Sequence, residues 1–272
     1  MRMTLTMVVL LVTTVPAVAC GTTSDCRLGD RVYRIHMPKN AAADARPGAI
    51  IYSHGYRGTA AGSMGNGAFR AVADRLGVAL VATQGEGGTW DLPNAPRPGP
   101  RTEMAYFDAL KAALVERHGI DPDNLLVTGF SAGGMVTWNV ACEWGGEFAA
   151  FAPIAGTFWA PVPNSCPSLP VDMIHIHGTS DRTVPMKGRA IGPTAQGDVG
   201  AALDLLAREG SFGPWRDAGT RGRLRCRERA GTAHFMQLCL HEGGHSIRAE
   251  WLADTWRTFA RRGVLKGTGP GG

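Results

Sequence analysis

Apolar positions along the chain fall into two patterns: short continuous runs, and longer stretches with helical spacing. Short apolar runs of roughly 4–8 residues are typical of strands buried on both faces. The expected strands are residues 31–37, 49–53, 78–83, 125–128, 151–155, 173–177, 224–226 and 235–240. The expected helices are residues 68–76, 104–118, 132–142, 199–208 and 249–261. This alternation predicts an α/β fold, with helices on both faces of a mostly parallel central sheet.

The first 19 residues have the layout of a secretory signal peptide. A weakly basic start precedes an apolar run over residues 3–15, and Ala17-Val18-Ala19 supplies the small residues that a signal peptidase needs. The run is too short for a membrane span, which needs about 20 apolar residues. We therefore expect an exported protein, periplasmic or extracellular, cleaved after Ala19.

Residues 20–272 contain no linker-like tract and no repeat, so we expect one α/β domain. Lipid anchoring at Cys20 is the less favoured alternative. A lipoprotein signal usually has a leucine-like residue three positions before its cysteine, where this chain has Ala17. A monomer is expected.

The net charge of +5 is modest and partly local. Five arginines alternate along one segment: Arg221, Arg223, Arg225, Arg227 and Arg229. Alternate residues share one face of a strand, so this stripe is either a basic surface for nucleic acid or another acidic partner, or a solvated strand edge. The edge is preferred because no aromatic platform or recognition helix accompanies the arginines. No nucleic-acid partner is expected.

Six cysteines in an exported chain indicate disulfides rather than metal ligands, and no C-x-x-C pair is present. Cys226 and Cys239 flank two strand-like runs and are candidates to close a hairpin. Cys142 and Cys166 are candidates to tie the helix over residues 132–142 to a later loop. The remaining two cysteines have no assigned partner.

The segment Gly129-Phe130-Ser131-Ala132-Gly133 stands between an expected strand and an expected helix. It matches G-x-S-x-G in the context that the nucleophile elbow of α/β-hydrolases requires. The turn lifts the serine oxygen clear of the sheet and aims the N-terminus of the helix at developing negative charge. Ser131 is therefore the candidate nucleophile. It needs a base, because a serine hydroxyl attacks poorly until its proton is removed.

Asp181 and His245 are the candidate acid and base. Asp181 follows the strand over residues 173–177 and His245 follows the last expected strand, in the order serine, acid, histidine that this architecture uses. Taken alone, Asp181 is equally consistent with a loop carboxylate that caps a turn. The complete, correctly ordered set favours catalysis, in which Asp181 orients His245 and stabilises its charged form.

The segment His54-Gly55-Tyr56 follows a buried strand, at the place where a second oxyanion donor is expected. We assign the oxyanion hole to the backbone N–H groups of Tyr56 and Ala132. His54 is expected to satisfy hydrogen bonds of its loop rather than to act as a base.

Residues 241–245 (H-E-G-G-H) match the H-E-x-x-H motif of zinc proteases. That chemistry places both histidines on one helix, whereas each of the two central glycines costs a helix about 1 kcal/mol relative to alanine. The preceding residues 235–240 also resemble a strand. Neither a metal nor a cofactor is expected. His175 and His177 are interpreted as a core and a loop histidine rather than as ligands.

Two tryptophans are expected to contact substrate. Trp90 lies in a glycine-rich loop, where an aromatic residue is hard to explain by packing alone, and Trp159 follows the strand after the nucleophile helix. Trp138, on that helix, is expected in the core. Only residues 156–170 separate the strands between which lipases insert a lid, so we expect no lid domain and an open cleft.

Five segments together resemble a known family. They are residues 54–56 (H-G-Y), 129–133 (G-F-S-A-G), 141–143 (A-C-E), 177–185 (H-G-T-S-D-R-T-V-P) and 243–245 (G-G-H). They resemble the polyhydroxybutyrate depolymerase-like esterases, relatives of the feruloyl and acetylxylan esterases. The resemblance extends from about residue 26 to the end of the chain.

This resemblance implies secretion, no metal, and a serine triad of Ser131, Asp181 and His245. It also implies pairing of Cys142 with Cys166. The implied substrates are esters, either polyesters or plant cell-wall esters. The expected function is therefore an exported serine carboxylesterase that works through an acyl-enzyme intermediate. The alternatives are an acyltransferase or a peptidase on the same scaffold, and a catalytically silent secreted binding protein.

Overall fold

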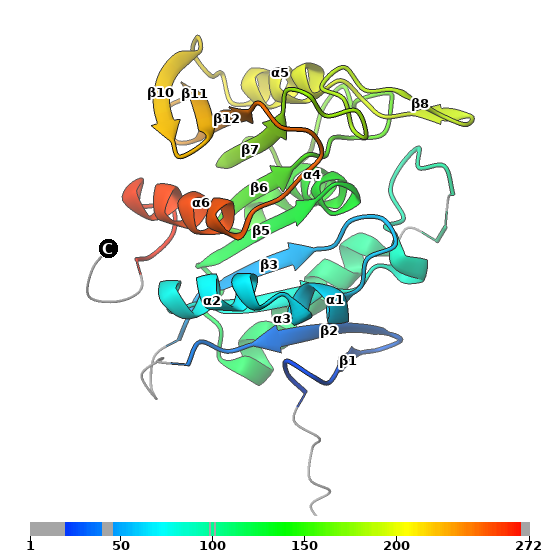
Figure 1. Cartoon of the computed structure of the whole chain (residues 1–272), viewed down its shortest axis with the longest axis vertical. Coiled ribbons are helices and arrows are strands. Elements are labelled where there is room, and N and C mark those ends of the chain that lie inside the picture. The colour runs from blue at the N-terminus through cyan, green and yellow to red at the C-terminus, as the bar shows by residue number, and fades with distance from the viewer. Residues whose placement is uncertain (1–19, 40–45, 98, 101, 268–272) are drawn as a thin grey trace, which may run out of the picture.

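The computed structural model describes residues 20–39, 46–97, 99–100 and 102–267. The expected signal peptide and the bond after Ala19 lie outside the described residues. Within them, strands and helices alternate along most of the chain (Figure 1). No helix of the described part is long and apolar enough to span a bilayer.

Ten of the described strands form one sheet, in the spatial order β1-β2-β4-β3-β5-β6-β7-β12-β11-β10. They are β1 (Cys26–Leu28), β2 (Arg31–His36), β3 (Ala49–Ser53), β4 (Ala79–Thr83), β5 (Leu125–Phe130), β6 (Ala150–Ile154), β7 (Met173–Gly178), β10 (Arg216–Arg221), β11 (Leu224–Ala230) and β12 (Phe235–His241). From β4 to β12 neighbouring strands run parallel, and antiparallel pairs extend both edges. Two short strands, β8 (Ala190–Ile191) and β9 (Thr194–Ala195), form a separate hairpin.

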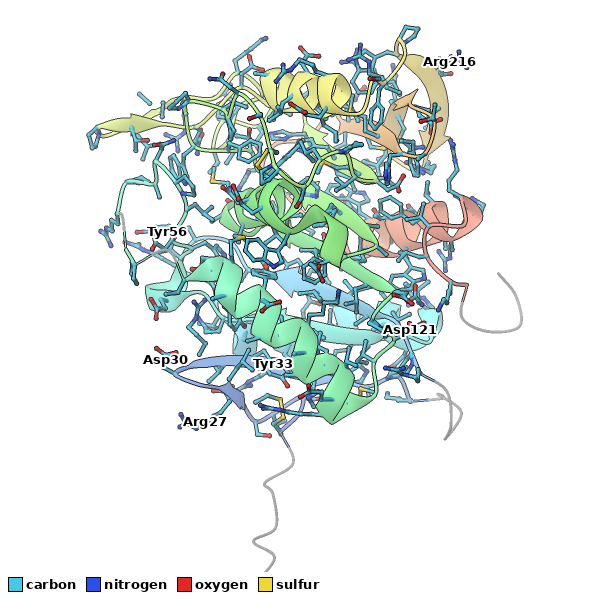
Figure 2. The ribbon with its side chains drawn as sticks, turned by 180° about the vertical axis from the view of Figure 1, so that it is seen from behind. Arg27, Asp30, Tyr33, Tyr56, Asp121 and Arg216 are labelled. Atoms are coloured by element: carbon cyan, nitrogen blue, oxygen red, sulfur yellow. A yellow bond between two sulfur atoms is a disulfide. The ribbon has the colours of Figure 1, made fainter. Side chains whose placement is uncertain are left out.

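Helices cover both faces of the sheet (Figures 1 and 2). They are α1 (Ala60–Gly65), α2 (Gly67–Leu76), α3 (Glu103–His118), α4 (Ala132–Trp144), α5 (Val199–Glu209) and α6 (Ala249–Arg261), with the short 3₁₀ turns η1 (Glu86–Gly88) and η2 (Gly145–Glu147). One buried cluster joins the sheet to α3, α4 and α5, and the other joins it to α1, α2 and α6. In β3, Ile50 packs into one cluster and Ile51 into the other. This two-sided burial explains why the central strands are continuous apolar runs.

The predicted strands and helices all have counterparts, whose bounds differ by a few residues, and the α/β prediction is confirmed. The structure adds β1, α1, β10 and the short β8–β9 hairpin. The residues of α1, A-A-G-S-M-G, have weak helical preference because of their glycines. The helix is stabilised at its start by Thr59, whose side chain accepts a hydrogen bond from the Gly62 N–H. β10, R-D-A-G-T-R, lacks an apolar alternation.

The interpretation of the arginine stripe as a solvated strand edge is confirmed for the exposure of Arg223, Arg225 and Arg227 but wrong for the position of their strand. β11 carries most of these arginines, and it lies between β12 and β10, with β10 as the edge strand. The polar sequence of β10 concealed this, because an edge strand exposed to water needs few apolar residues. Arg221 is also partly buried rather than solvated, since its guanidinium donates to Gln237 Oε1 at 2.6 Å.

Disulfides join Cys142 to Cys166 and Cys226 to Cys239, the two pairs named as candidates. Cys226 and Cys239 lie directly opposite each other on the antiparallel strands β11 and β12. The other two cysteines pair with each other, Cys20 with Cys26.

Candidate active site

Ser131 lies on the sharp turn between β5 and α4, with φ 59° and ψ −119°. An L residue rarely adopts a positive φ, so this backbone is strained and must be held by its surroundings. The Ser131 N–H donates to the Ile154 carbonyl at 2.9 Å, which ties the turn to the end of β6. Ala132 begins α4, where the first backbone N–H groups have no acceptor within the helix.

Two glycines allow this turn to pack tightly. A Cβ at Gly133 would lie 1.9 Å from the Ser53 carbonyl oxygen, and a Cβ at Gly129 would lie 2.3 Å from the Gly133 oxygen. The first turn of α4 therefore lies directly against the end of β3. Any larger residue at either position would push the helix away from the sheet.

His245 and Asp181, from two separate loops, meet beside this turn. His245 Nδ1 donates to Asp181 Oδ2 at 2.7 Å, and the Asp181 side chain is fully buried. The other carboxylate oxygen accepts the backbone N–H groups of Thr183 and Val184, at 2.8 and 2.9 Å. The carboxylate is thereby fixed in place by three donors.

The His245 ring packs on Phe130, with ring centroids 4.5 Å apart. Phe130 immediately precedes Ser131, so this contact holds the histidine next to the serine turn. The His245 side chain is 17% exposed, which leaves it accessible from solvent. The three residues that the sequence singled out as serine, acid and base are thus brought to one end of the sheet.

The loop after β3 lies against the same turn. A Cβ built on Gly55 would lie 3.4 Å from Ser131 Cβ. The Arg57 N–H donates to the Gly88 carbonyl and the Gly58 N–H to the Gly55 carbonyl, at 2.7 and 2.9 Å, which fixes the loop. The Tyr56 side chain is 53% exposed at the surface (Figure 2).

His54 supports this loop, as expected. Its Nδ1 donates to the Gly55 carbonyl at 2.8 Å, and its Nε2 accepts the Gly85 N–H at 3.1 Å. Burial lowers the pKa of His54 below its ordinary value, which favours the neutral ring that this hydrogen-bond pattern requires.

The expectation that Trp90 contacts substrate is wrong. Trp90 is only 3% exposed, and its indole N–H donates to the His54 carbonyl at 2.9 Å. Its ring also packs on that of His54. An aromatic residue in a glycine-rich loop is explained here by packing beneath the loop after β3. Trp159 is half-buried and its backbone bridges to Gln196, whereas Trp138 is in the core.

Behind Asp181, two buried histidines form a hydrogen-bonded chain. His177 Nε2 donates to the Val184 carbonyl at 2.7 Å, so its Nδ1 accepts from His175 Nε2 at 2.9 Å. His175 Nδ1 in turn accepts the Trp138 indole N–H at 3.3 Å. Burial lowers the pKa of both histidines, which keeps them neutral.

His177 is the neighbour of the acid that sequence reasoning missed. Its Nε2 lies 3.6 Å from Asp181 Oδ2, and both side chains are fully buried. Its position in the sequence could have predicted this contact, because His177 is near the end of β7 and four residues before Asp181. The interpretation of His175 and His177 as core and loop histidines was half right, because both are in the core.

The H-E-G-G-H segment does not form a helix. His241 is the last residue of β12 and its Nδ1 accepts the Gly243 N–H at 3.1 Å. The two histidines therefore do not share a helix face as zinc proteases require. Cys20, Cys26 and His118 also lie close together, but the two cysteines are joined in a disulfide and offer no thiolates to a metal.

No protein-family model matches the chain. Three relatives bear esterase names. A candidate esterase of Nocardia uniformis subsp. tsuyamanensis is 31% identical over 62% of this chain and 51% of its own length. A protein assigned as feruloyl esterase C of Aspergillus flavus is 28% identical over 60% and 59%. An acetylxylan esterase of Coprinopsis cinerea is 30% identical over 51% and 38%. The chain thus spans about half the length of these relatives.

Solved structures match over most of the chain. The acetyl xylan esterase from Aspergillus awamori has a TM-score of 0.61 at 15% identity, over 89% of this chain and 97% of its own. A carboxylesterase from Mesorhizobium loti has a TM-score of 0.54 at 20% identity, over 86% and 98%. This chain has the α/β-hydrolase fold. In α/β-hydrolases a serine at the turn after the central strand is the usual nucleophile, and Ser131 occupies that place in this hydrolase fold.

Proposed function

We propose that the chain is an exported serine carboxylesterase, with Ser131 as nucleophile, His245 as base and Asp181 as acid. The observation that carries the proposal is the 2.7 Å hydrogen bond from His245 to the buried Asp181, beside a serine on a strained turn. A structural histidine–aspartate pair has no need of a serine held in such a backbone conformation.

In this mechanism His245 Nε2 accepts the Ser131 hydroxyl proton while the serine oxygen attacks the ester carbonyl carbon. The carbonyl oxygen becomes an oxyanion, stabilised by the backbone N–H groups of Tyr56 and Ala132. His245 then donates its proton to the leaving alcohol, and an acyl-enzyme remains. Water, activated by His245, releases the acid and restores Ser131. Asp181 keeps the His245 proton on Nδ1 and stabilises the charged ring.

The proposed substrates are plant cell-wall esters or polyesters. The names of the relatives support feruloyl and acetyl esters of cell-wall polymers. The polyhydroxybutyrate depolymerase-like reading rests on the sequence resemblance. No helix interrupts the chain between β6 and β7, which supports an open cleft able to admit a polymer.

Export is part of the proposal. The three disulfides of the described residues suit an oxidising compartment. The disulfide of Cys20 with Cys26 supports a free exported protein over lipid anchoring at Cys20, because an anchor would need the same sulfur atom.

The test is hydrolysis of p-nitrophenyl butyrate by the chain from Cys20 onward, produced in an oxidising compartment, alongside Ser131→Ala. Loss of the nucleophile is expected to lower kcat by about 10⁴–10⁶-fold. Ser63→Ala, on helix α1, is the matched control and should retain full activity, because the Ser63 hydroxyl has no place in the proposed mechanism. Equal activity of wild type and Ser131→Ala would show that another residue attacks. Products formed with and without added alcohol separate hydrolysis from acyl transfer.

A further inference from the structure

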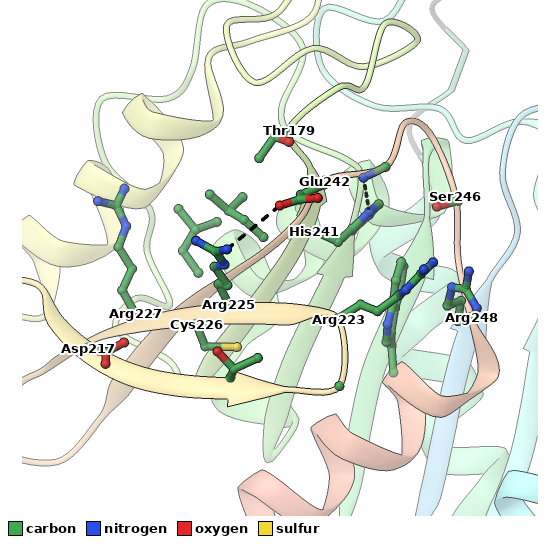
Figure 3. Close-up of a pocket in the computed structure, with 16 residues that line it drawn as sticks. Thr179, Asp217, Arg223, Arg225, Cys226, Arg227, His241, Glu242, Ser246 and Arg248 are labelled. Atoms are coloured by element: carbon green, nitrogen blue, oxygen red, sulfur yellow. Dashed lines mark hydrogen bonds and ion pairs between the residues drawn. The ribbon is translucent and has the colours of Figure 1, made fainter.

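A pocket of about 1080 Å³ lies beside the proposed triad, bounded by the β10–β11 hairpin and the end of β12 (Figure 3). Thr179, from the loop that carries Asp181, lines it. So do Gly243 and Ser246, from the loop that carries His245. None of the three proposed triad residues lines the pocket itself. Because it is lined by neighbours of Asp181 and His245 in their own loops, the pocket adjoins the proposed catalytic centre.

Four arginines line this pocket, against two acidic side chains, Asp217 and Glu242. The arginines are Arg223, Arg225, Arg227 and Arg248. The side chains of Arg223 and Arg248 form no ion pair or hydrogen bond within the described part of the chain. Both extend at the same end of the pocket, from the β10–β11 turn and from the start of α6 (Figure 3).

The other two arginines are only loosely engaged. Arg225 faces Glu242 at 4.0 Å, and these side chains are 83% and 93% exposed, so water screens the pair strongly. Arg227 packs over the Trp215 ring at 4.5 Å, which leaves its hydrogen-bond donors unused. The pocket therefore presents a positive potential to solvent, which attracts anions.

His241, in the pocket wall, carries a polar atom without a partner. Its Nδ1 accepts the Gly243 N–H, so its hydrogen is on Nε2. His241 is 7% exposed, and its Nε2 has no hydrogen-bond partner among the described residues. A buried N–H without an acceptor is uncommon in proteins.

We propose that this pocket is an anionic subsite, which binds carboxylates of a uronic-acid-bearing polysaccharide whose ester reaches Ser131. The inference rests on the proposed esterase function. Arg225 and Arg227 alternate on β11, and Arg223 precedes them in the turn. Alternate strand residues lie about 7 Å apart, so these arginines form a row, which suits a polymer with repeated charges better than a single anion. Guanidinium groups bind carboxylates through paired hydrogen bonds.

The hydroxyl groups of the pocket also fit a carbohydrate. Thr179, Thr220 and Ser246 line it together with the arginines. These hydroxyl groups can both donate hydrogen bonds to sugar hydroxyls and accept hydrogen bonds from them. The phosphates of a nucleic-acid backbone can only accept.

Binding is measured first, because it needs no catalysis. Polygalacturonate without esters is titrated into wild type and into Ser131→Ala, with neutral xylan as the comparison polymer. Both proteins should bind polygalacturonate and not xylan, and the affinity should fall as ionic strength rises to about 0.15 M. Equal affinity for the two polymers, or tighter binding of single-stranded DNA of equal charge, would overturn the proposal.

The double variant R223Q/R248Q locates the subsite. It should weaken polygalacturonate binding about tenfold, as expected for the loss of two solvent-exposed charge pairs with carboxylates. The matched control R216Q/R257Q removes the same charge from exposed arginines outside the pocket, on β10 and α6. Retained affinity in the control supports the subsite. An equal loss in both variants would mean that net charge alone attracts the polymer, and the proposal would fail.

Kinetics separate this inference from the proposed function. The ratio of kcat/KM on acetylated polygalacturonate to that on p-nitrophenyl butyrate should fall about tenfold in R223Q/R248Q. If the wild type binds polygalacturonate through these arginines but hydrolyses neither ester, the esterase proposal fails and the anion site stands. If it hydrolyses both esters and R223Q/R248Q leaves the ratio unchanged, the anionic subsite fails and the esterase proposal stands.

Discussion

Ser131 has a strained backbone conformation, and the packing of its glycine neighbours shows what maintains it. Strained residues persist where the surrounding structure over-determines them. Here the constraint is close packing of backbone on backbone, between the first turn of α4 and the end of β3. The same packing explains why the serine motif needs glycine at its first and last positions.

Gly133→Ala tests this constraint. The added Cβ would meet the Ser53 carbonyl at 1.9 Å, and backbone on that side cannot move without shifting β3. We expect a loss of roughly 1–3 kcal/mol or more in the free energy of unfolding, together with a large loss of esterase activity. Gly146→Ala is the matched control, since a Cβ there meets no atom within 4 Å. Urea midpoints measure the difference, and similar midpoints for the two variants would contradict the packing argument.

Among the elements, the β10–β11–β12 side of the sheet is the part least evident in the sequence. β10 and β11 are rich in arginine and poor in apolar residues, and they extend the sheet beyond its parallel centre. The Cys226–Cys239 disulfide holds β11 to β12. Arg221 adds to this by contacting both sulfur atoms and Gln237. Covalent and polar links thus replace part of the apolar packing that the central strands use.

Removal of this disulfide, in Cys226→Ser with Cys239→Ser, should lower the free energy of unfolding. Closure of a loop of about 15 residues is worth about 3 kcal/mol in the chain-entropy model, and these cysteines are 13 residues apart. The Cys20–Cys26 bond spans only 6 residues, so Cys20→Ser with Cys26→Ser should cost less. Urea unfolding of both double variants compares them. A larger loss from the Cys20–Cys26 variant would refute the ranking.

At the scale of the whole molecule, five histidines have a pKa lowered chiefly by burial: His54, His118, His175, His177 and His241. In the unfolded chain a histidine titrates near pH 6.5. Below that pH the unfolded chain takes up protons that the folded protein does not, so acid favours unfolding through these groups. Above about pH 7 both states are neutral at these positions, and this contribution to the pH dependence disappears.

We therefore expect the free energy of unfolding to fall between about pH 7 and pH 5. His175→Gln should make this slope shallower by up to about 1.4 kcal/mol per pH unit, because one fewer proton is bound on unfolding. His175 is fully buried and, unlike His177, does not lie against Asp181, which makes it the clearer probe of the two. Urea midpoints over this pH range measure the slope. Stability that is constant or rises towards pH 5 would contradict the assignment of these rings as neutral.

The local pattern of apolar residues was sufficient to predict most of the strands and helices. The central strands are continuous apolar runs because helices cover both of their faces, and periodicity reports that burial directly. The order of Ser131, Asp181 and His245 along the chain follows from the order of the strands, so the candidate set was visible before its geometry. The cysteine pairs 142–166 and 226–239 were likewise candidates from their positions, and the family resemblance also implied the first of them.

Contacts between distant segments decided the rest. The sequence around Trp90 does not indicate that its ring packs beneath the loop of His54. The sequence around His177 likewise does not indicate that its ring lies against Asp181. The place of β11 inside the sheet depended on a polar strand that has no apolar signal of its own. The arginine-lined pocket forms only where β10, β11, β12 and the start of α6 converge. Periodicity records whether a side chain is buried, whereas its partner depends on how elements far apart in sequence pack together.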